Sequence, residues 1–357
     1  MSDGYEIKYF AASNSRSGFV NYFPQCFGED RGVRRLYVIK GGSGTGKSYF
    51  MRRAARCAEA AGLFVEYYYC SSDPASLDGV RITLQNGDRV GIIDGTPPHP
   101  WEPKLPGVVE EIINLGAFWD SRALAASGEE IRRLQGIKAA EYKAAYAYLS
   151  AAGQVCDVIE DCVRDVVYFS KMRAVAQKTV KCIPEGDRFD AEPALISSVG
   201  GRGEVKFNTY TQLAEKVYTV EDFYGVGHLM LREIFEASSA RTCEVKVSYD
   251  PLCPHRIDGL FYPNASVAFV VGEGDGGEYC HSLGVRRFAS GDALKERRSA
   301  LRRAVGLRDS LVAGAVERFA GASRAHFDIE KIYSSAMDFD AKSKFEEEFC
   351  RKILDFN

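Results

Sequence analysis

The residues best suited to chemistry lie at positions 41–48, which read Gly-Gly-Ser-Gly-Thr-Gly-Lys-Ser. They match G-x-x-x-x-G-K-[ST], the pattern of a loop that binds the phosphates of a nucleoside triphosphate. Glycines let such a loop turn so that several backbone N–H groups point at one anion. We expect Lys47 to contact the β- and γ-phosphates and the Ser48 hydroxyl to ligate Mg²⁺. The residues predicted to bind the nucleotide are Gly41, Gly42, Ser43, Gly44, Thr45, Gly46, Lys47 and Ser48.

A loop of this kind must follow a strand and begin a helix. Residues 36–39, Leu-Tyr-Val-Ile, form a short apolar run of strand-forming residues. Residues 48–60 contain neither Gly nor Pro, and Gly62 follows as a helix stop. The sequence therefore predicts the order strand, loop and helix around the motif.

Asp94 ends a second apolar run, residues 89–94. Ligands of open α/β sheets lie beyond the carboxyl ends of the strands, so we predict Asp94 to be the second Mg²⁺ ligand. The alternative is that it opens the turn formed by residues 94–98. Gly95 stands where many fast ATPases have a glutamate that activates water. Hydrolysis is therefore expected to be slow, to use a base from elsewhere, or to give way to a different acceptor.

Two more polar side chains follow strand-like segments near this edge. Asp73 comes after the aromatic and β-branched run 63–70 and is predicted to act as general base or to orient the attacking water. Its alternative role is to cap a turn before Pro74. His99 either contacts the phosphates or packs within its loop. The predicted catalytic residues are Lys47, Asp94 and Asp73.

Several segments of the first half reappear in the same order in the second half, which indicates a duplication. Segment 10–22 matches 195–207, and segment 90–95 matches 267–272. Segment 73–79 matches 250–259, and segment 159–169 matches 329–339. We therefore predict two related domains, residues 1–185 and 186–357.

The second copy has lost the residues that would bind a triphosphate. A gapless alignment places Asp222 on the first loop glycine, His228 on Lys47 and Leu229 on Ser48. Val271 replaces Asp94. The substitutions add negative charge where a phosphate would approach and remove a hydroxyl and a carboxylate that would hold Mg²⁺. We expect residues 186–357 to bind no triphosphate in the usual way.

Composition limits the classes of protein that the chain can belong to. The chain has 357 residues, a formal net charge of −3 and 46% apolar residues. These values predict a soluble two-domain protein without the strongly basic character of a nucleic-acid binder. No signal peptide or membrane span is readable, and none of the ten cysteines forms a C-x-x-C pair. A cytoplasmic location is expected.

Each half ends in a long helical stretch, residues 128–181 and 292–352. Basic residues outnumber acidic ones between 292 and 324. The stretch is either a solvated helix face or a surface that docks an acidic partner. The basic residues are Lys295, Arg297, Arg298, Arg302, Arg303, Arg308, Arg318 and Arg324.

Taken together, the motifs resemble a bacterial family of two-domain, tandem P-loop ATPases or nucleotide-kinase-like proteins of poorly defined role. The segments that carry the resemblance are residues 37–48, 70–79, 94–99 and 111–120. The resemblance implies ATP binding. Members of the family often keep a second, better-preserved loop, which is degenerate in this chain.

The predicted fold is α/β, with two P-loop NTPase-like domains built on parallel sheets, each carrying a helical appendage. The predicted function is Mg²⁺-dependent binding and hydrolysis of ATP in the first domain. GTP is less favoured because no N/T-K-x-D segment is present. One alternative is a nucleotide or small-molecule kinase whose arginine-rich region 286–303 clamps the acceptor. The other is an ATP-gated switch or scaffold with negligible turnover. The sequence predicts neither the oligomeric state nor an arginine finger.

Overall fold

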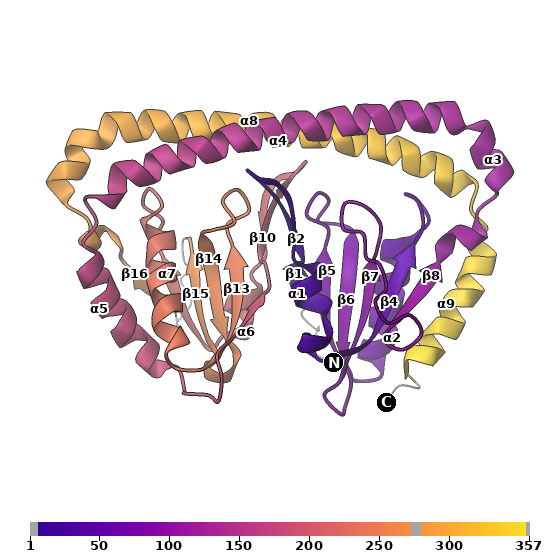
Figure 1. The fold of residues 1–357 in the computed structure, drawn as a ribbon, viewed down its shortest axis with the longest axis horizontal. Coiled ribbons are helices and arrows are strands. Elements are labelled where there is room, and N and C mark those ends of the chain that lie inside the picture. The colour runs from indigo at the N-terminus through magenta and orange to yellow at the C-terminus, as the bar shows by residue number, and fades with distance from the viewer. Residues whose placement is uncertain (1–5, 273–279, 355–357) are drawn as a thin grey trace.

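The computed structural model describes residues 6–272 and 280–354, which form two α/β units lying side by side beneath two long helices (Figure 1). The strands of the first unit are β1 (Ile7–Phe10), β2 (Ala12–Ser15), β3 (Gly18–Asn21), β4 (Val33–Lys40), β5 (Phe64–Tyr69), β6 (Leu77–Thr83), β7 (Arg89–Asp94) and β8 (Glu110–Asn114). Those of the second are β9 (Asp190–Pro193), β10 (Ser197–Gly200), β11 (Gly203–Lys206), β12 (Lys216–Val220), β13 (Glu244–Tyr249), β14 (Ile257–Tyr262), β15 (Val267–Val271) and β16 (Cys280–Leu283).

The helices follow the same repeated plan. The first half contributes α1 (Phe23–Phe27), α2 (Lys47–Ala60), α3 (Ser121–Ala126), α4 (Gly128–Arg164) and α5 (Phe169–Thr179). The second contributes α6 (Thr209–Leu213), α7 (Val226–Ser239), α8 (Gly291–Ser335) and α9 (Phe339–Leu354). Short 3₁₀ turns lie at Glu29–Arg31, Leu115–Phe118, Val180–Cys182, Pro263–Ala265 and Arg286–Phe288.

The two six-stranded sheets have the same topology. Their strand orders are β1-β5-β6-β7-β4-β8 and β9-β13-β14-β15-β12-β16, and a two-stranded hairpin accompanies each. The α/β class is confirmed, but the prediction of parallel sheets is wrong in one respect. Strands β6 and β14 run antiparallel to both of their neighbours. Only residues 70–76 join β5 to β6, whereas a parallel crossover needs roughly a dozen or more residues.

The reversed direction of β6 matters for the site. It brings the first residues of β6 to the edge of the sheet where β4, β5 and β7 end. The loops that follow those three strands and the beginning of β6 therefore converge on one edge. This edge carries the residues that the sequence singled out.

The long helices exchange partners between the two halves. Helix α4 starts above the first sheet and ends above the second, and α8 returns antiparallel to it (Figure 1). Helix α5 consequently packs against α7 of the second half, and α9 packs against α2 of the first. The end of each helical stretch thus covers the sheet of the other repeat. A domain boundary between residues 185 and 186 does not reveal this exchange.

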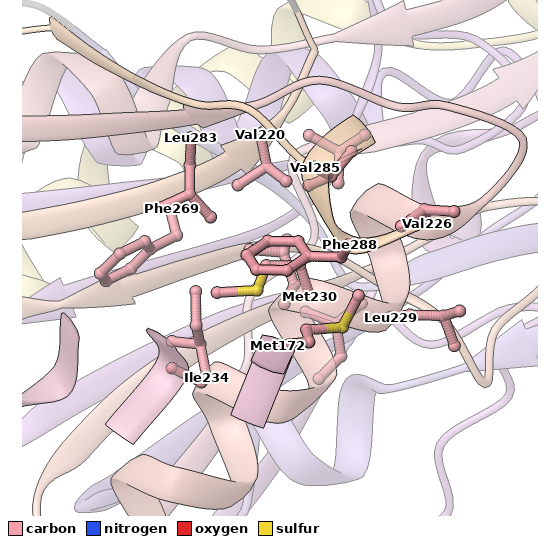
Figure 2. Close-up of a cluster of buried hydrophobic side chains, with 14 of the residues drawn as sticks. Met172, Val220, Val226, Leu229, Met230, Ile234, Phe269, Leu283, Val285 and Phe288 are labelled. Carbon is pink, nitrogen blue, oxygen red and sulfur yellow. The ribbon is translucent and has the colours of Figure 1, made fainter. Parts of the chain in front are cut away.

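Buried apolar side chains hold the exchanged helices in place. Met172 of α5 lies in one cluster with Met230, Phe269 and Phe288 of the second half (Figure 2). On the other side, Phe349 of α9 belongs to the core over the first sheet. Its ring centroid lies 4.8 Å from that of Tyr37 and 4.7 Å from that of Phe50. The cores of both units therefore depend on residues from both halves.

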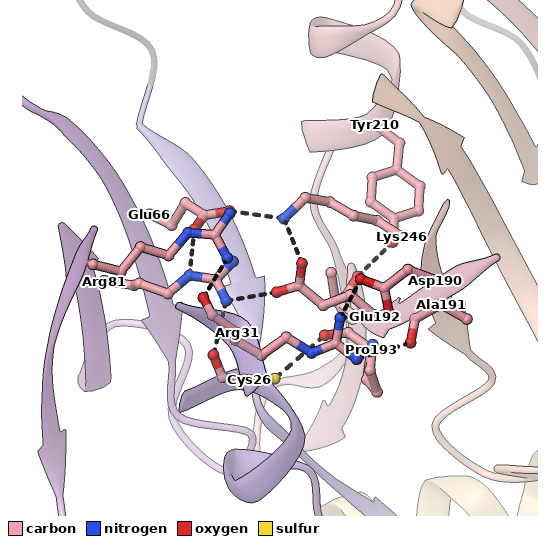
Figure 3. A network of polar contacts seen from close by, with 12 residues as sticks. Cys26, Arg31, Glu66, Arg81, Asp190, Ala191, Glu192, Pro193, Tyr210 and Lys246 are labelled. Carbon is pink, nitrogen blue, oxygen red and sulfur yellow. Dashed lines mark hydrogen bonds and ion pairs between the residues drawn. The ribbon is translucent and has the colours of Figure 1, made fainter. Parts of the chain in front are cut away.

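A buried network of charges joins the two sheets at their neighbouring edges (Figure 3). The Arg81 side chain is fully buried and pairs with Glu66 and Glu192, each at 2.6 Å. Lys246 of β13 lies 2.8 Å from Glu66 and 3.6 Å from Glu192. Burial disfavours the charged form of both carboxyls, but the two cations outweigh it and hold the pKa of Glu66 and of Glu192 below the usual value. The network therefore stabilises the fold above the ordinary glutamate pKa, and this contribution is lost as the pH falls.

We expect Phe349→Ala to lower the free energy of unfolding by about 3–5 kcal/mol, because it opens a cavity in the first core. Chemical denaturation followed by tryptophan fluorescence measures the change. Glu348→Ala, at an exposed position on the same helix, should change stability little. Equal stability of both variants would contradict the packing of α9 against the first sheet.

Replacing Arg81 with Met should cost about 3–5 kcal/mol of stability, because Glu66 and Glu192 then lose a buried cation. Arg34→Met is the matched control, since Arg34 pairs with Asp88 on the surface and should matter little. Denaturant titrations of both variants at pH 7 measure the difference. A loss for Arg81→Met no larger than the loss for Arg34→Met would show that the network is not stabilising.

Candidate functional site

The glycine-rich loop joins β4 to α2 at the edge of the first sheet. Gly44 and Gly46 have φ angles of +74° and +75°, in the left-handed region that favours glycine. Gly46 is the N-cap of α2 and has no side chain that could satisfy the free N–H groups of the first turn. A helix start of this kind, preceded by a glycine loop, is suited to an anion.

Lys47, Ser48 and Asp94 come together beside this loop. The Lys47 ammonium donates to the carbonyl oxygens of Gly41 at 3.0 Å and Gly42 at 2.9 Å, and lies 3.5 Å from Oδ2 of Asp94. Asp94 ends β7 opposite Ile39 of β4. Its Oδ1 accepts hydrogen bonds from the backbone N–H and the hydroxyl of Thr96, which fixes the carboxylate. Ser48 lines the same pocket, and its Oγ accepts a hydrogen bond from the N–H of Leu77 at 2.9 Å.

Asp73 also lines this pocket, but its carboxylate is engaged elsewhere. One oxygen accepts a bond from the N–H of Ala75 and lies 3.1 Å from the guanidinium of Arg202. Arg202 belongs to the turn between β10 and β11 of the second half. In this arrangement Asp73 caps a turn, which is the alternative role considered for it, and it also anchors that hairpin.

His99 lines the pocket, 5% exposed, between two acidic residues. Its Nδ1 bonds to the carbonyl oxygen of Asp94 at 2.7 Å, and its Nε2 lies 3.3 Å from Oδ2 of Asp78. Burial lowers the pKa of His99, but the hydrogen bond to Asp78 and the charges of Asp78 and Asp94 outweigh it, so the pKa is raised. His99 supports the loop that follows Asp94. It is both packed within that loop and part of the pocket lining.

A pocket of about 700 Å³ lies over the loop and is covered by the two long helices. We call the covering residues the roof. The roof consists of Gln135, Lys138 and Tyr142 of α4 with Ser323, His326, Phe327, Ile329, Glu330, Tyr333 and Ser334 of α8.

The roof touches the loop directly. The Ser334 hydroxyl donates to the Gly44 carbonyl oxygen at 3.1 Å. Nδ1 of His326 lies 3.4 Å from Oγ of Ser43 and 3.1 Å from Nζ of Lys138. Sequence reasoning missed these residues because they lie far from the motif along the chain. The one signal was the repeat match that paired Glu330 with Glu160.

The second half has a corresponding pocket of about 610 Å³, and three polar side chains that line it are bonded to the backbone around it. Oδ1 of Asp222 accepts a hydrogen bond from the N–H of Gly225 at 3.0 Å. The imidazole of His228 bonds to the carbonyl oxygen of Ile257, and Lys206 donates to that of Val271 at 2.7 Å. A carboxylate at the start of α7 opposes a phosphate there.

Several basic side chains of the stretch 292–324 form ion pairs within the chain. Arg297 pairs with Asp165, and Arg308 pairs with Asp309. Arg318 lies 3.6 Å from Glu141. Docking of an acidic partner on this stretch remains a prediction.

No family model, no curated protein and no solved structure matches this chain. Within residues 6–272 and 280–354, no group of three or more His, Cys, Asp and Glu side chains is arranged to hold a metal ion. Mg²⁺ is commonly held by only one or two protein groups together with phosphate oxygens and water, so a hydroxyl and a carboxylate such as those of Ser48 and Asp94 would suffice for that ion. None of the helices in the described part of the chain has the length and apolar character needed to cross a membrane.

We expect Gly44→Ala to destabilise the protein more than Gly32→Ala, although the two glycines have nearly the same φ angle. A Cβ on Gly32 meets open space. Alanine there is therefore penalised only for its left-handed backbone conformation, which costs roughly 1–2 kcal/mol. A Cβ on Gly44 would lie 2.5 Å from the carbonyl oxygen of Glu330, so α8 must also move. Thermal denaturation measures both. Equal losses would mean that α8 does not sit on the loop.

Proposed function

We propose that the first half of the chain binds Mg²⁺–ATP between the glycine-rich loop and the roof, and hydrolyses it slowly. The observation that carries this proposal is the convergence of Lys47, Ser48 and Asp94 at the uncapped start of α2. A link to the bacterial tandem P-loop ATPases that the motifs resemble is part of the same proposal. ATP is favoured over GTP on the sequence evidence alone.

The residues of the loop would act mainly through electrostatics. The N–H groups of the loop and the Lys47 ammonium offset negative charge on the β- and γ-phosphate oxygens, and this stabilisation grows as charge shifts during phosphoryl transfer. Ser48 and Asp94 would hold the metal ion, which, when bound, supplies further positive charge to these oxygens. Thr96 keeps Asp94 oriented toward Lys47.

Slow hydrolysis is proposed because each acidic side chain that lines the pocket in the described part of the chain already has a basic partner, Asp94 with Lys47 and Asp78 with His99 among them. Gly95 follows Asp94, Asp73 is paired with Arg202, and Glu330 is paired with His326 at 3.5 Å. A kinase with an arginine clamp at 286–303 is less favoured, because none of the described residues that line the pocket comes from that region.

A second candidate function is an ATP-gated switch, and the course of the long helices favours it. Helices α4 and α8 each line both pockets, α4 with Lys138 and Cys156, and α8 with His326 and Arg308. A nucleotide that moves the roof at the first pocket would therefore move the same helices at the second. Turnover distinguishes the two functions, because a switch needs none.

Lys47→Ala should weaken ATP binding about 10- to 100-fold and abolish turnover, because a charged hydrogen-bond donor to phosphate is lost. Calorimetric titration with Mg²⁺–ATP and release of phosphate measure the two effects. The control is Arg56→Ala, which removes an exposed cation from the same helix. Binding by Lys47→Ala as tight as that of Arg56→Ala would overturn the site.

A further inference from the structure

We propose that Lys138 of the first half contacts the terminal phosphate and that His326 of the second half positions it, so that the second half completes the nucleotide site of the first. The inference deepens the proposed function and rests on it. Lys138 comes from α4 and His326 from α8, so the contact forms only where the two long helices lie side by side over the pocket. The first half alone lacks one member of the pair.

The geometry places Lys138 next to the loop through His326. Nδ1 of His326 is 3.1 Å from the Lys138 ammonium and 3.4 Å from the hydroxyl of Ser43, the third residue of the loop. An ammonium can only donate, so Nδ1 accepts and the ring proton lies on Nε2. Nε2 faces Oε1 of Glu330 at 3.5 Å. The imidazole is thus held by Glu330 on one side and holds Lys138 above the loop on the other.

The surroundings of Lys138 disfavour its charged form on balance, and a further anion in the pocket would stabilise that form. Burial lowers the pKa of Lys138, and the positive charge of Lys47 acts in the same direction. The hydrogen bond from His326 and the charge of Lys47 lower the pKa of Glu330, which stays charged and faces the same space. A terminal phosphate held by Lys47 would lie within the field of both lysines, and its charge would offset their repulsion.

The duplication supplies an independent reason to assign a role to this position. The register that places Ile159 and Glu160 on Ile329 and Glu330 also places Lys138 on Arg308. Arg308 lines the second pocket as Lys138 lines the first. The helix position thus carries a cation in both copies, although the second loop has lost its lysine. The residue aligned with Lys138 is Arg308, so a guanidinium fits the corresponding place in the second pocket.

The inference predicts that Lys138 discriminates between nucleotides that have and lack the terminal phosphate. Dissociation constants for Mg²⁺–ADP and for the non-hydrolysable Mg²⁺–AMP-PNP are measured on the full chain by calorimetry, and turnover is measured with Mg²⁺–ATP. Lys138→Ala should reduce the preference for the triphosphate about 10- to 100-fold and leave ADP binding nearly unchanged. Its turnover should fall by at least about 100-fold. Lys138→Arg should restore most of the preference.

Lys143→Ala is the control, because it removes an exposed lysine from the same helix and should behave like the parent chain. His326→Ala should lower the same preference, and its effect should not add to that of Lys138→Ala, because both act through one contact. Triphosphate preference in Lys138→Ala within about threefold of that of Lys143→Ala would overturn the inference. A parent chain that binds neither nucleotide would instead overturn the proposed function. If Lys47→Ala loses nucleotide binding but Lys138→Ala keeps the full preference for the triphosphate, the inference about Lys138 is overturned and the proposed function stands.

Discussion

The antiparallel pairing of α4 with α8 is the constraint on which the rest of the structure depends. A sheet with an apolar face must be covered, and in this chain each sheet receives part of its cover from the other repeat. Because α4 carries the chain from the first sheet to the second, α5 can only pack beside α7. Because α8 carries it back, α9 packs beside α2. Neither repeat can form its complete core without the other.

The two repeats face each other with equivalent segments, and they have diverged in charge where they meet. Phe10 and Leu195, which the sequence alignment pairs, form an antiparallel bridge. Glu66 and Lys246 are each the third residue of equivalent strands, β5 and β13, and they pair at 2.8 Å. Two identical carboxylates at these positions would repel each other. An opposite pair attracts, so the divergence of the two copies favours their association within one chain.

Much of the candidate site could be predicted because it is local in sequence. The glycines, Lys47 and Ser48 are contiguous, and Asp94 ends a strand that pairs with the strand before the loop. The duplication could also be read, since whole segments repeat in order. The antiparallel direction of β6 could also have been predicted, because residues 70–76 are too few for a parallel crossover.

The roof and the exchange of helices could not be predicted in the same way. An amphipathic helix shows that it needs a partner but not which one, and α4 satisfies the same pattern over either sheet. The contact of His326 with Ser43 joins residues far apart in the chain and follows only from the return of α8 over the first half. Asp73 illustrates the same limit, because its partner Arg202 lies on a hairpin of the second half.

The exchange also explains why the second half can differ at its loop, where Asp222, His228 and Leu229 align with Gly41, Lys47 and Ser48, and still be needed by the first half. The second half contributes α8 and Phe339 of α9 to the first pocket. Its β10–β11 hairpin lies next to the pocket, where Ser198 donates to the carbonyl oxygen of Ser71, a residue of the lining. These parts are separate from the start of α7, where Asp222 now accepts the hydrogen bond of Gly225. Substitutions at the second loop therefore leave the cover of the first site intact. Loss of α8 would remove that cover, so the structural constraint falls on the helix rather than on the second loop.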